Sequence, residues 1–357
     1  MAKRILVTGA GGFIGGFIVA EALKRGYETW AAVRRTTNRE FLQDERIHFI
    51  ELDFTDELAL KATLAQAIAD NGGKWDYVVH NLGATKAANY LDFERINYGY
   101  MRLLVDTLKA LDAVPEVFLL MSSLSVMGVG DDEGYTPFKI TDDPVPNTRY
   151  GMSKAKAENY LKMVPDFPYT IFRCTGVYGP HERDYFLMMK SIASGFDFSV
   201  GFRKQMLTFI YVKDLATAVI NALEAGPKRR AYFISESRGY TQKEFREIVC
   251  RELKKKFVIP ITCPIWLVQM VCVFCTIYTK FTGKPTTLNV DKFRILKQRN
   301  WLCETADTER DFNFTPQYSL ERGVKETIAW YNQAGKIKKK YTFTGYCLYR
   351  LKNKTPI

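Results

Sequence analysis

The stretch Thr8-Gly9-Ala10-Gly11-Gly12-Phe13-Ile14-Gly15 decides the fold of this chain. It follows a short apolar strand and begins a helical pattern, and its glycines have the spacing G-x-x-G-x-x-G. Glycine allows a tight turn and lets the backbone approach a pyrophosphate, which the free N–H groups of the helix N-terminus can bind. The stretch therefore predicts a dinucleotide-binding turn, whose phosphate-binding residues are Gly9, Gly12, Phe13, Ile14 and Gly15.

Short apolar runs alternate with helical patterns through the first half of the chain, which indicates a parallel sheet wrapped by helices. Several of these runs end in small or polar residues, as strands do where their carboxyl ends form a ligand crevice. The predicted fold class is α/β, a Rossmann-type doubly wound parallel sheet. The expected strands are 4–7, 28–33, 48–51, 77–81, 117–122 and 169–173, and the expected helices are 13–25, 56–71, 91–111 and 149–163.

The second half is less regular and predicts a smaller, mostly helical C-terminal substrate lobe. Two further strand-like runs, 207–212 and 231–235, are expected to return to the main sheet. The expected division is a dinucleotide-binding domain over 1–175 with 205–236 returning to it, a substrate-binding lobe over 176–204 and 237–335, and a basic, aromatic tail over 336–357.

The charge balance favours an anionic ligand. The 357 residues include 51 Lys and Arg against 39 Asp and Glu, which gives a formal net charge of +12. Zinc-finger spacings, RNA-binding signatures and basic-helix patterns are absent from the sequence, so we expect a small-molecule substrate rather than nucleic acid. No grouping of His, Cys, Asp and Glu has the spacing of a metal site, so no metal is expected.

The N-terminus and the cysteines predict a cytoplasmic protein. After Met1 the chain runs directly into the first strand and the glycine-rich turn, without the apolar segment and cleavage site of a secretory signal. The seven cysteines are odd in number and scattered, which suits a reducing compartment.

The second predicted strand ends in Arg34-Arg35, where an NAD-binding chain would carry an acidic residue for the adenosine ribose. A guanidinium binds phosphate oxygens through two parallel hydrogen bonds. Arg34 in particular is therefore predicted to bind a 2′-phosphate, which favours NADP(H) as the cofactor over NAD(H). The alternative is that both arginines are solvated loop charges.

The spacing Tyr150-x-x-x-Lys154 lies on a helical pattern, so both side chains are expected on one side of the helix. A tyrosine titrates near pH 10, and an adjacent ammonium is expected to lower its pKa toward neutrality. The run 119–123 ends a predicted strand in the hydroxyls of Ser122 and Ser123, which can hydrogen-bond a carbonyl or alkoxide. Together with the glycine-rich turn, this order of motifs predicts catalysis rather than an exposed helix face.

The sequence resembles the extended short-chain dehydrogenase/reductase family, also called the NAD-dependent epimerase/dehydratase family, over about residues 3 to 332. The resemblance implies that Tyr150 is the catalytic acid/base, that Ser123 orients the reacting oxygen and that Lys154 holds the nicotinamide ribose. Family members are often homodimers through the helices that correspond to 91–111 and 149–163. Besides the motifs above, the resemblance rests on Asp53, residues 80–84, Asn97, Arg173, residues 177–180 and residues 209–216.

The resemblance also implies further contacts with the cofactor. Asp53 and Phe54 are expected to frame the adenine. Asn97 is expected to be a supporting polar residue of the cofactor site, with a purely local bond at a helix start as the alternative. The residues expected to line the cofactor are Leu82, Gly83 and Ala84.

Two departures from the family's subgroups narrow the expected chemistry. Sugar-nucleotide 4,6-dehydratases carry an Asp-Glu pair just after the catalytic hydroxyl residue, where this chain has Leu124 and Ser125. Sugar-nucleotide epimerases usually place an Asn after the sixth strand, where this chain has Gly176. The sequence is more similar to the branch of 3β-hydroxysteroid dehydrogenases and dihydroflavonol 4-reductases, which act on bulky apolar ketones or secondary alcohols.

The sequence leaves three functions open. The leading hypothesis is an NADP(H)-dependent oxidoreductase that interconverts a ketone and a secondary alcohol on a bulky apolar or sugar-like substrate. The first alternative is an NAD-dependent nucleotide-sugar epimerase, which oxidises and re-reduces one carbon with a retained cofactor. The second is a cofactor-sensing scaffold protein without chemistry, although such a protein would be expected to lose Tyr150 or Lys154.

The segment 257–279 carries no charged residue, and lysines flank it on both sides. Its length is that of a transmembrane candidate, but it contains Pro260, Pro264 and Gln269 and lies inside the substrate lobe. Three interpretations remain open: a membrane-spanning helix, a wholly buried core helix, and a wall of the substrate cleft that also touches a membrane surface. The basic, aromatic tail supports peripheral attachment to anionic lipid, unless it is simply solvated.

Overall fold

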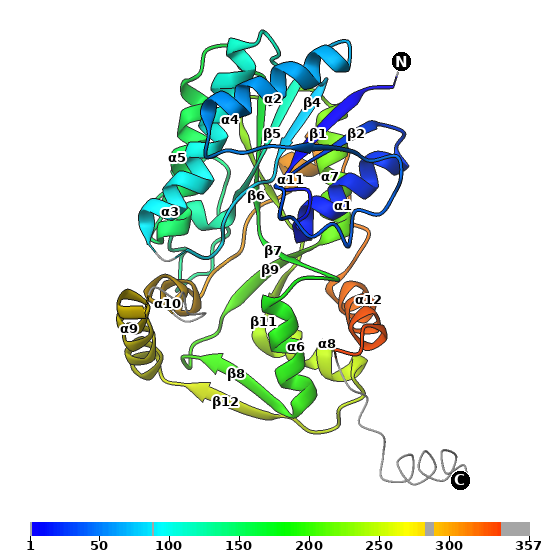
Figure 1. Cartoon of the computed structure of the whole chain (residues 1–357). Coiled ribbons are helices and arrows are strands. Elements are labelled where there is room, and N and C mark those ends of the chain that lie inside the picture. The colour runs from blue at the N-terminus through cyan, green and yellow to red at the C-terminus, as the bar shows by residue number, and fades with distance from the viewer. Residues whose placement is uncertain (1, 88, 283–288, 337–357) are drawn as a thin grey trace, which may run out of the picture.

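The structure is a computed structural model, and it describes residues 2–87, 89–282 and 289–336. Seven parallel strands form the main sheet in the order β10-β6-β5-β4-β1-β2-β3 (Figure 1). The order 3-2-1-4-5-6 is that of a dinucleotide-binding Rossmann sheet, so the predicted fold class is confirmed. The strands are β1 (Arg4–Thr8), β2 (Glu28–Val33), β3 (His48–Glu51), β4 (Tyr77–His80), β5 (Val117–Ser123), β6 (Tyr169–Cys174) and β10 (Ala231–Ile234).

Helices cover both faces of this sheet and bury an apolar core on each side. On one face Ile18 and Val219 pack against the sheet, and on the other face Leu64, Leu104 and Leu161 do so. Each of these side chains is inaccessible to solvent or nearly so. The first face is covered by α1 (Phe13–Lys24) and α7 (Val212–Glu224), and the second by α2 (Glu57–Asp70), α4 (Tyr100–Ala110) and α5 (Arg149–Met163).

The helix expected over 91–111 is interrupted. The chain forms α3 (Tyr90–Glu94), one π-helical turn η1 (Arg95–Gly99) and then α4. A π turn adds one residue to the helical repeat and is found frequently at functional sites. Here it carries the buried Asn97.

The expectation that 207–212 returns to the main sheet is wrong. This run forms β9 (Met206–Tyr211), which pairs with β7 (Gly176–Tyr178) and β11 (Gly239–Thr241) in a separate three-stranded sheet. The open edge of β6 is occupied by β10, so β9 has no place beside it.

The C-terminal part contains a helical lobe, as expected, together with two small sheets that were not predicted. A two-stranded sheet pairs β8 (Phe196–Val200) with β12 (Ile259–Cys263). In a second departure, α11 (Ala306–Phe312) packs on the main sheet, where the Thr308 hydroxyl donates to the Phe233 carbonyl at 2.7 Å. The other helices are α6 (Asp184–Ser194), α8 (Gln242–Glu252), α9 (Ile265–Thr282), α10 (Val290–Lys297) and α12 (Leu320–Gln333). Apart from Lys336, the tail lies outside the described residues.

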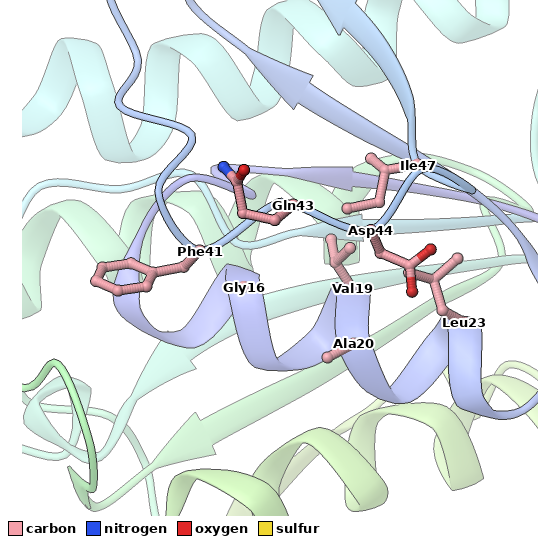
Figure 2. Close-up of a pocket in the computed structure, with 8 residues that line it drawn as sticks. All are labelled: Gly16, Val19, Ala20, Leu23, Phe41, Gln43, Asp44 and Ile47. Atoms are coloured by element: carbon pink, nitrogen blue, oxygen red, sulfur yellow. The ribbon is translucent and has the colours of Figure 1, made fainter. Parts of the chain in front are cut away.

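The connection from β2 to β3 passes over α1 and is held there by apolar contacts (Figure 2). Leu42 and Ile47 are buried in the same core cluster as the inner face of α1. A hollow of about 110 Å³ remains between this connection and α1, lined in part by Phe41 and Gly16. The packing fixes the connection, and with it the turn that begins at Arg34, beside the N-terminal half of α1.

The interpretation of 257–279 as a wholly buried core helix is wrong. The segment forms β12 and most of α9, and Figure 1 shows α9 at the outer edge of the lower lobe. Within the described residues, no helix has the combined length and apolarity needed to cross a bilayer. The large apolar side chains of α9 that are at least 40% exposed, here called the α9 apolar surface, are Trp266, Leu267, Met270, Val271, Val273, Phe274, Ile277, Tyr278 and Phe281.

Candidate active site

The glycine-rich turn joins β1 to α1 in a conformation that only small residues allow. A Cβ atom at Gly15 would lie 2.2 Å from the Gly9 carbonyl oxygen, so helix and turn approach too closely for any side chain. The first turn of α1 has no acidic residue, and no side chain in the described structure caps it. Its N–H groups and the positive end of the helix dipole are therefore free to hold an anion. This cradle fits the pyrophosphate of a dinucleotide.

A buried histidine ties the carboxyl ends of β1 and β4 together beside this cradle. His80 Nδ1 lies 3.2 Å from the Thr8 hydroxyl oxygen, which also accepts a hydrogen bond from the Leu82 N–H at 3.2 Å. Burial lowers the pKa of His80 to about 3, so the ring stays neutral near pH 7. Leu82 is thereby fixed at the edge of the crevice, where the sequence predicts a cofactor contact.

Asn97 links the 82–84 loop to the helix that carries Tyr150 and Lys154. Its side-chain oxygen accepts from the Ala84 N–H at 2.8 Å, and its amide donates to the Ala84 carbonyl and to the Ser153 hydroxyl at 3.1 and 2.9 Å. A Cβ atom at Gly83 would lie 3.0 Å from Lys154 Nζ, so the loop borders the lysine. The alternative of a purely local bond at Asn97 is wrong.

Asp53 and Phe54 follow β3 and differ in exposure. The exposed Asp53 carboxylate accepts from the N–H and the hydroxyl of Thr55, at 2.9 and 2.6 Å, and these bonds lower its pKa. The Phe54 side chain is buried, with its ring centroid 5.4 Å from that of Tyr100. If Phe54 contacts an adenine, the backbone of Phe54 must therefore make the contact.

The exposed Arg34 lies at the end of β2, next to the glycine-rich turn. Its N–H donates to the Thr37 hydroxyl at 2.9 Å, and Thr37 itself packs over Gly11, where a Cβ atom would meet its methyl group at 2.2 Å. Among the described residues no carboxylate forms an ion pair with Arg34. Its guanidinium can therefore bind an anionic ligand near the turn.

Tyr150 lies in the first turn of α5, the helix that packs on β5. The Thr148 hydroxyl caps this helix by accepting from the Gly151 N–H at 3.0 Å. A Cβ atom at Gly151 would lie 2.4 Å from the Ser125 carbonyl oxygen of the short turn η2 (Leu124–Val126), so glycine lets the helix come this close. The close approach brings the Tyr150 phenol near the Ser123 hydroxyl, which acts to lower its pKa.

Lys154 is buried one turn after Tyr150, and its ammonium donates to the Met121 carbonyl oxygen at 2.8 Å. Burial lowers the pKa of Lys154 to about 8. Burial also raises the pKa of Tyr150 to about 12, with the nearby Ser123 hydroxyl opposing the rise. The expectation that Lys154 lowers the pKa of Tyr150 is thus wrong for this structure, because desolvation of the phenol dominates. Tyr150 is poised as a proton donor.

Sequence reasoning missed Glu158, which lies one further turn along α5. Its carboxylate accepts from the Ser122 hydroxyl at 2.6 Å and pairs with the Arg173 guanidinium at 2.7 Å, and both charged groups are almost wholly buried. Oppositely charged partners and hydrogen bonds allow such a pair to be buried. Glu158 thus holds Ser122, and with it the end of β5, in place. The i, i+4 spacing of Glu158 from Lys154 was the sequence feature that could have indicated that it lies on the same face of the helix.

A cavity of about 700 Å³ lies between the start of α5 and the helices α9 and α10. Met152 of α5 lines it on one side, and Cys272 and Phe293 line it on the other. Two cations, Arg294 and Lys297, also line it. The cavity lining therefore combines apolar side chains with these two cations and with one carboxylate, Asp132.

Comparison with known proteins identifies the family. A family model described as "NAD dependent epimerase/dehydratase family" matches residues 5–235. The chain belongs to this family. The resemblance to extended short-chain dehydrogenase/reductases is confirmed, and the chain is an enzyme of that type. The scaffold alternative is therefore set aside.

Three relatives show the breadth of the family around this chain. UDP-glucose 4-epimerase of Vibrio cholerae is 25% identical over 343 residues, which cover 94% of this chain and 97% of the relative. Ceramide reductase of Caulobacter vibrioides is 23% identical over 344 residues, which cover 94% and 96%. A solved structure of dTDP-glucose 4,6-dehydratase from Bacillus anthracis in complex with NAD has a TM-score of 0.71 at 20% identity, covering 93% of this chain and 97% of that one.

The family relatives favour a different functional hypothesis from the one that the sequence favours. They favour the nucleotide-sugar alternative over the NADP(H)-dependent ketone reductase. They give no specific support to the 3β-hydroxysteroid dehydrogenase and dihydroflavonol reductase branch. NAD is the cofactor in the matched structure, so the comparisons do not support the predicted preference for NADP(H). The homodimer and the cytoplasmic location stay predictions.

Proposed function

We propose that this enzyme moves a hydride between a nicotinamide dinucleotide and a carbon that alternates between secondary alcohol and ketone. The observation that carries the proposal is the buried Lys154, bonded to the Met121 carbonyl one helical turn from Tyr150, with the Ser123 hydroxyl near the Tyr150 phenol. A bound nicotinamide supplies or accepts the hydride. Tyr150 gives a proton to the substrate oxygen in reduction and takes it back in oxidation, while Ser123 orients that oxygen.

The remaining predicted residues are assigned to holding the cofactor. The turn that contains Gly9, Gly12 and Gly15, with Phe13 and Ile14 at the start of α1, is assigned to the pyrophosphate. Lys154 is assigned to the nicotinamide ribose, and Asp53 and the Phe54 backbone to the adenine. Asn97 acts as a positioning residue, since it fastens the loop of Leu82, Gly83 and Ala84 to α5.

For the substrate, a nucleotide sugar is the first candidate. Relatives that match nearly the whole chain are named as acting on UDP-glucose or dTDP-glucose. The cavity next to Met152 is lined by Arg294 and Lys297 against one carboxylate, Asp132, and the excess of positive charge suits a diphosphate. In this mode the enzyme oxidises and re-reduces one carbon, so the cofactor stays bound and unchanged overall.

Net reduction of a ketone is the second candidate. It is supported by Arg34 in place of a ribose-binding carboxylate, by Leu124 and Ser125 in place of a dehydratase Asp-Glu pair, and by the match to a relative named ceramide reductase. The two modes differ in cofactor balance. Tightly retained NAD with interconversion of UDP-sugars and no net oxidation of added cofactor supports the epimerase; stoichiometric loss of NADPH absorbance with a ketone supports the reductase.

The preference between cofactors can be tested at Arg34. If its guanidinium binds a 2′-phosphate, the parent chain binds NADPH more tightly than NADH, and salt weakens this preference. Replacing it (Arg34→Asp) should reverse the preference, with a loss of about tenfold or more in NADPH affinity from the lost charged hydrogen bond. Fluorescence titration of both cofactors measures this, and Arg35→Asp is the control for charge alone. Equal affinities in the parent contradict the role.

The pH profile tests the role of Lys154. The pKa of Tyr150 lies near 12, so Tyr150 stays protonated, whereas the pKa of Lys154 lies near 8. We therefore expect kcat/KM for reduction to be constant at low pH and to fall as the pH rises through about 8, where the ammonium loses its proton. In Lys154→Arg the fall should move upward, because a guanidinium keeps its charge. A parent profile that is level through this range counts against a charged Lys154.

A further inference from the structure

The α9 apolar surface extends along the helix and includes many more side chains than the isolated exposed apolar residues of an ordinary protein surface. Its residues follow two neighbouring rows along the helix, one through Trp266, Met270 and Ile277 and one through Val271, Phe274 and Phe281, so a broad face of α9 meets solvent. Monomeric soluble proteins rarely expose contiguous apolar areas of this kind without a partner. Figure 1 shows α10 beside α9, on the side toward the middle of the molecule, and the exposed side chains show that another face of α9 is uncovered.

The apolar surface continues along the chain into β12 and β8. Phe196 and Phe198 are exposed on β8, while Asp197 between them is buried and paired with Arg246. In the parallel register Ile259 lies opposite Phe196, so it shares the outer face of this two-stranded sheet and is also exposed. Only Pro264 separates β12 from α9.

Unpaired positive charge adjoins this apolar surface. Arg203 and Lys204 follow β8, and Lys254 and Lys256 precede β12; all four are exposed, and no carboxylate of the described residues forms an ion pair with them. The segments 198–204 and 254–282 together contain six Lys and Arg and no Asp or Glu. An occupant must therefore be apolar in its interior and negatively charged at its edge.

The charge distribution selects the occupant. A second copy of the chain would bring the same basic segments against each other, and the 336–357 segment carries no acidic residue either. The face carries Trp266 and Tyr278, the aromatic types enriched at membrane–water interfaces. We propose that the α9 apolar surface docks on an anionic lipid surface, with its basic neighbours on the lipid headgroups.

Docking would place the cavity that α9 lines beside the lipid. Val273 belongs to the α9 apolar surface and also lines the 700 Å³ cavity that reaches Met152. α9 therefore contributes residues both to the exposed apolar surface and to the cavity lining. Docking itself does not rest on the proposed function, so a Tyr150→Phe chain should bind lipid as the parent does.

Co-sedimentation of the full chain with vesicles tests the proposal. The vesicles are phosphatidylcholine alone, or phosphatidylcholine and phosphatidylglycerol in equal parts, at low and at high salt. We expect binding to the anionic vesicles that salt weakens. In the double variant Trp266→Ser with Phe274→Ser, side chains that are 62% and 65% exposed are lost, so the fold should persist while binding falls about tenfold or more.

Matched control variants distinguish binding through this surface from non-specific adsorption to vesicles. Leu58→Ser removes a side chain that is 81% exposed on α2, away from α9, and should bind vesicles as the parent does. Lys254→Gln with Lys256→Gln should weaken binding to anionic vesicles only, whereas Lys61→Gln on α2 should not. Thermal unfolding midpoints confirm that each variant folds. A parent that stays in the supernatant with both lipids at low salt, or a Trp266/Phe274 variant that binds like the parent, overturns the proposal.

Discussion

Turnover should fall about 10²–10⁴-fold in Tyr150→Phe, which is the usual contribution of a positioned acid or base. The change removes only the phenolic oxygen and leaves the ring that packs near Phe93. The turn proposed to hold the pyrophosphate lies between β1 and α1, so the affinity for the cofactor should remain nearly unchanged. Steady-state kinetics with either substrate candidate and fluorescence titration of the cofactor measure the two quantities separately.

A second tyrosine on the same helix serves as the control. Tyr160 donates its hydroxyl hydrogen to Asp106 on α4, far along α5 from the candidate site. Tyr160→Phe should therefore retain the parent turnover. A Tyr150→Phe enzyme with most of the parent activity would refute the acid/base assignment, and equal losses in both variants would point to damage of α5 rather than to lost chemistry.

The part of the fold that the sequence predicted well is the part with strong periodicity. β2 and β3 have the predicted bounds, and the other main-sheet strands differ by one residue at an end, because each is a buried apolar run between turn residues. The sheet that a strand joins is not predicted by this periodicity. The run that became β9 is as apolar as its neighbours, and only the occupation of the β6 edge by β10 sends it to another sheet.

In the candidate site, motif residues were predictable but their electrostatics were not. The spacing of Tyr150 and Lys154 indicated a shared helix face, but not that the Met121 carbonyl would take the lysine ammonium or that burial would raise the tyrosine pKa. Both effects depend on atoms brought in by β5. The long-range bonds of Asn97 depend likewise on the π turn, which sequence periodicity does not reveal.

The segment 257–279 illustrates a limit of composition. A charge-free run is compatible with a buried helix, a spanning helix or an exposed apolar face, since all three exclude charge for the same reason. What decides between them is whether other elements cover the helix. Coverage is a tertiary property, and in this structure α10 covers one side of α9 only.

Gly15→Ala should abolish tight cofactor binding, whereas Gly16→Ala should leave it intact. The two variants add one methyl group at adjacent positions of α1. At Gly15 the new carbon would lie 2.2 Å from the Gly9 carbonyl oxygen and 2.8 Å from the Ala10 Cα, so the turn must move. At Gly16 the nearest atoms are 3.9 Å away, an ordinary contact distance.

The displaced turn loses the N–H groups that would hold the pyrophosphate. Each hydrogen bond to a charged group contributes about 1.5–3 kcal/mol, so losing two lowers the affinity by about a hundredfold or more. Alanine is also the better helix former by about 1 kcal/mol, so Gly16→Ala should be at least as stable as the parent. Titration of NADH and NADPH and thermal unfolding without cofactor distinguish the two effects. If Gly15→Ala binds either cofactor with the parent affinity, the glycine-rich turn is not the phosphate site, and the assignment of α1 to the pyrophosphate fails with it.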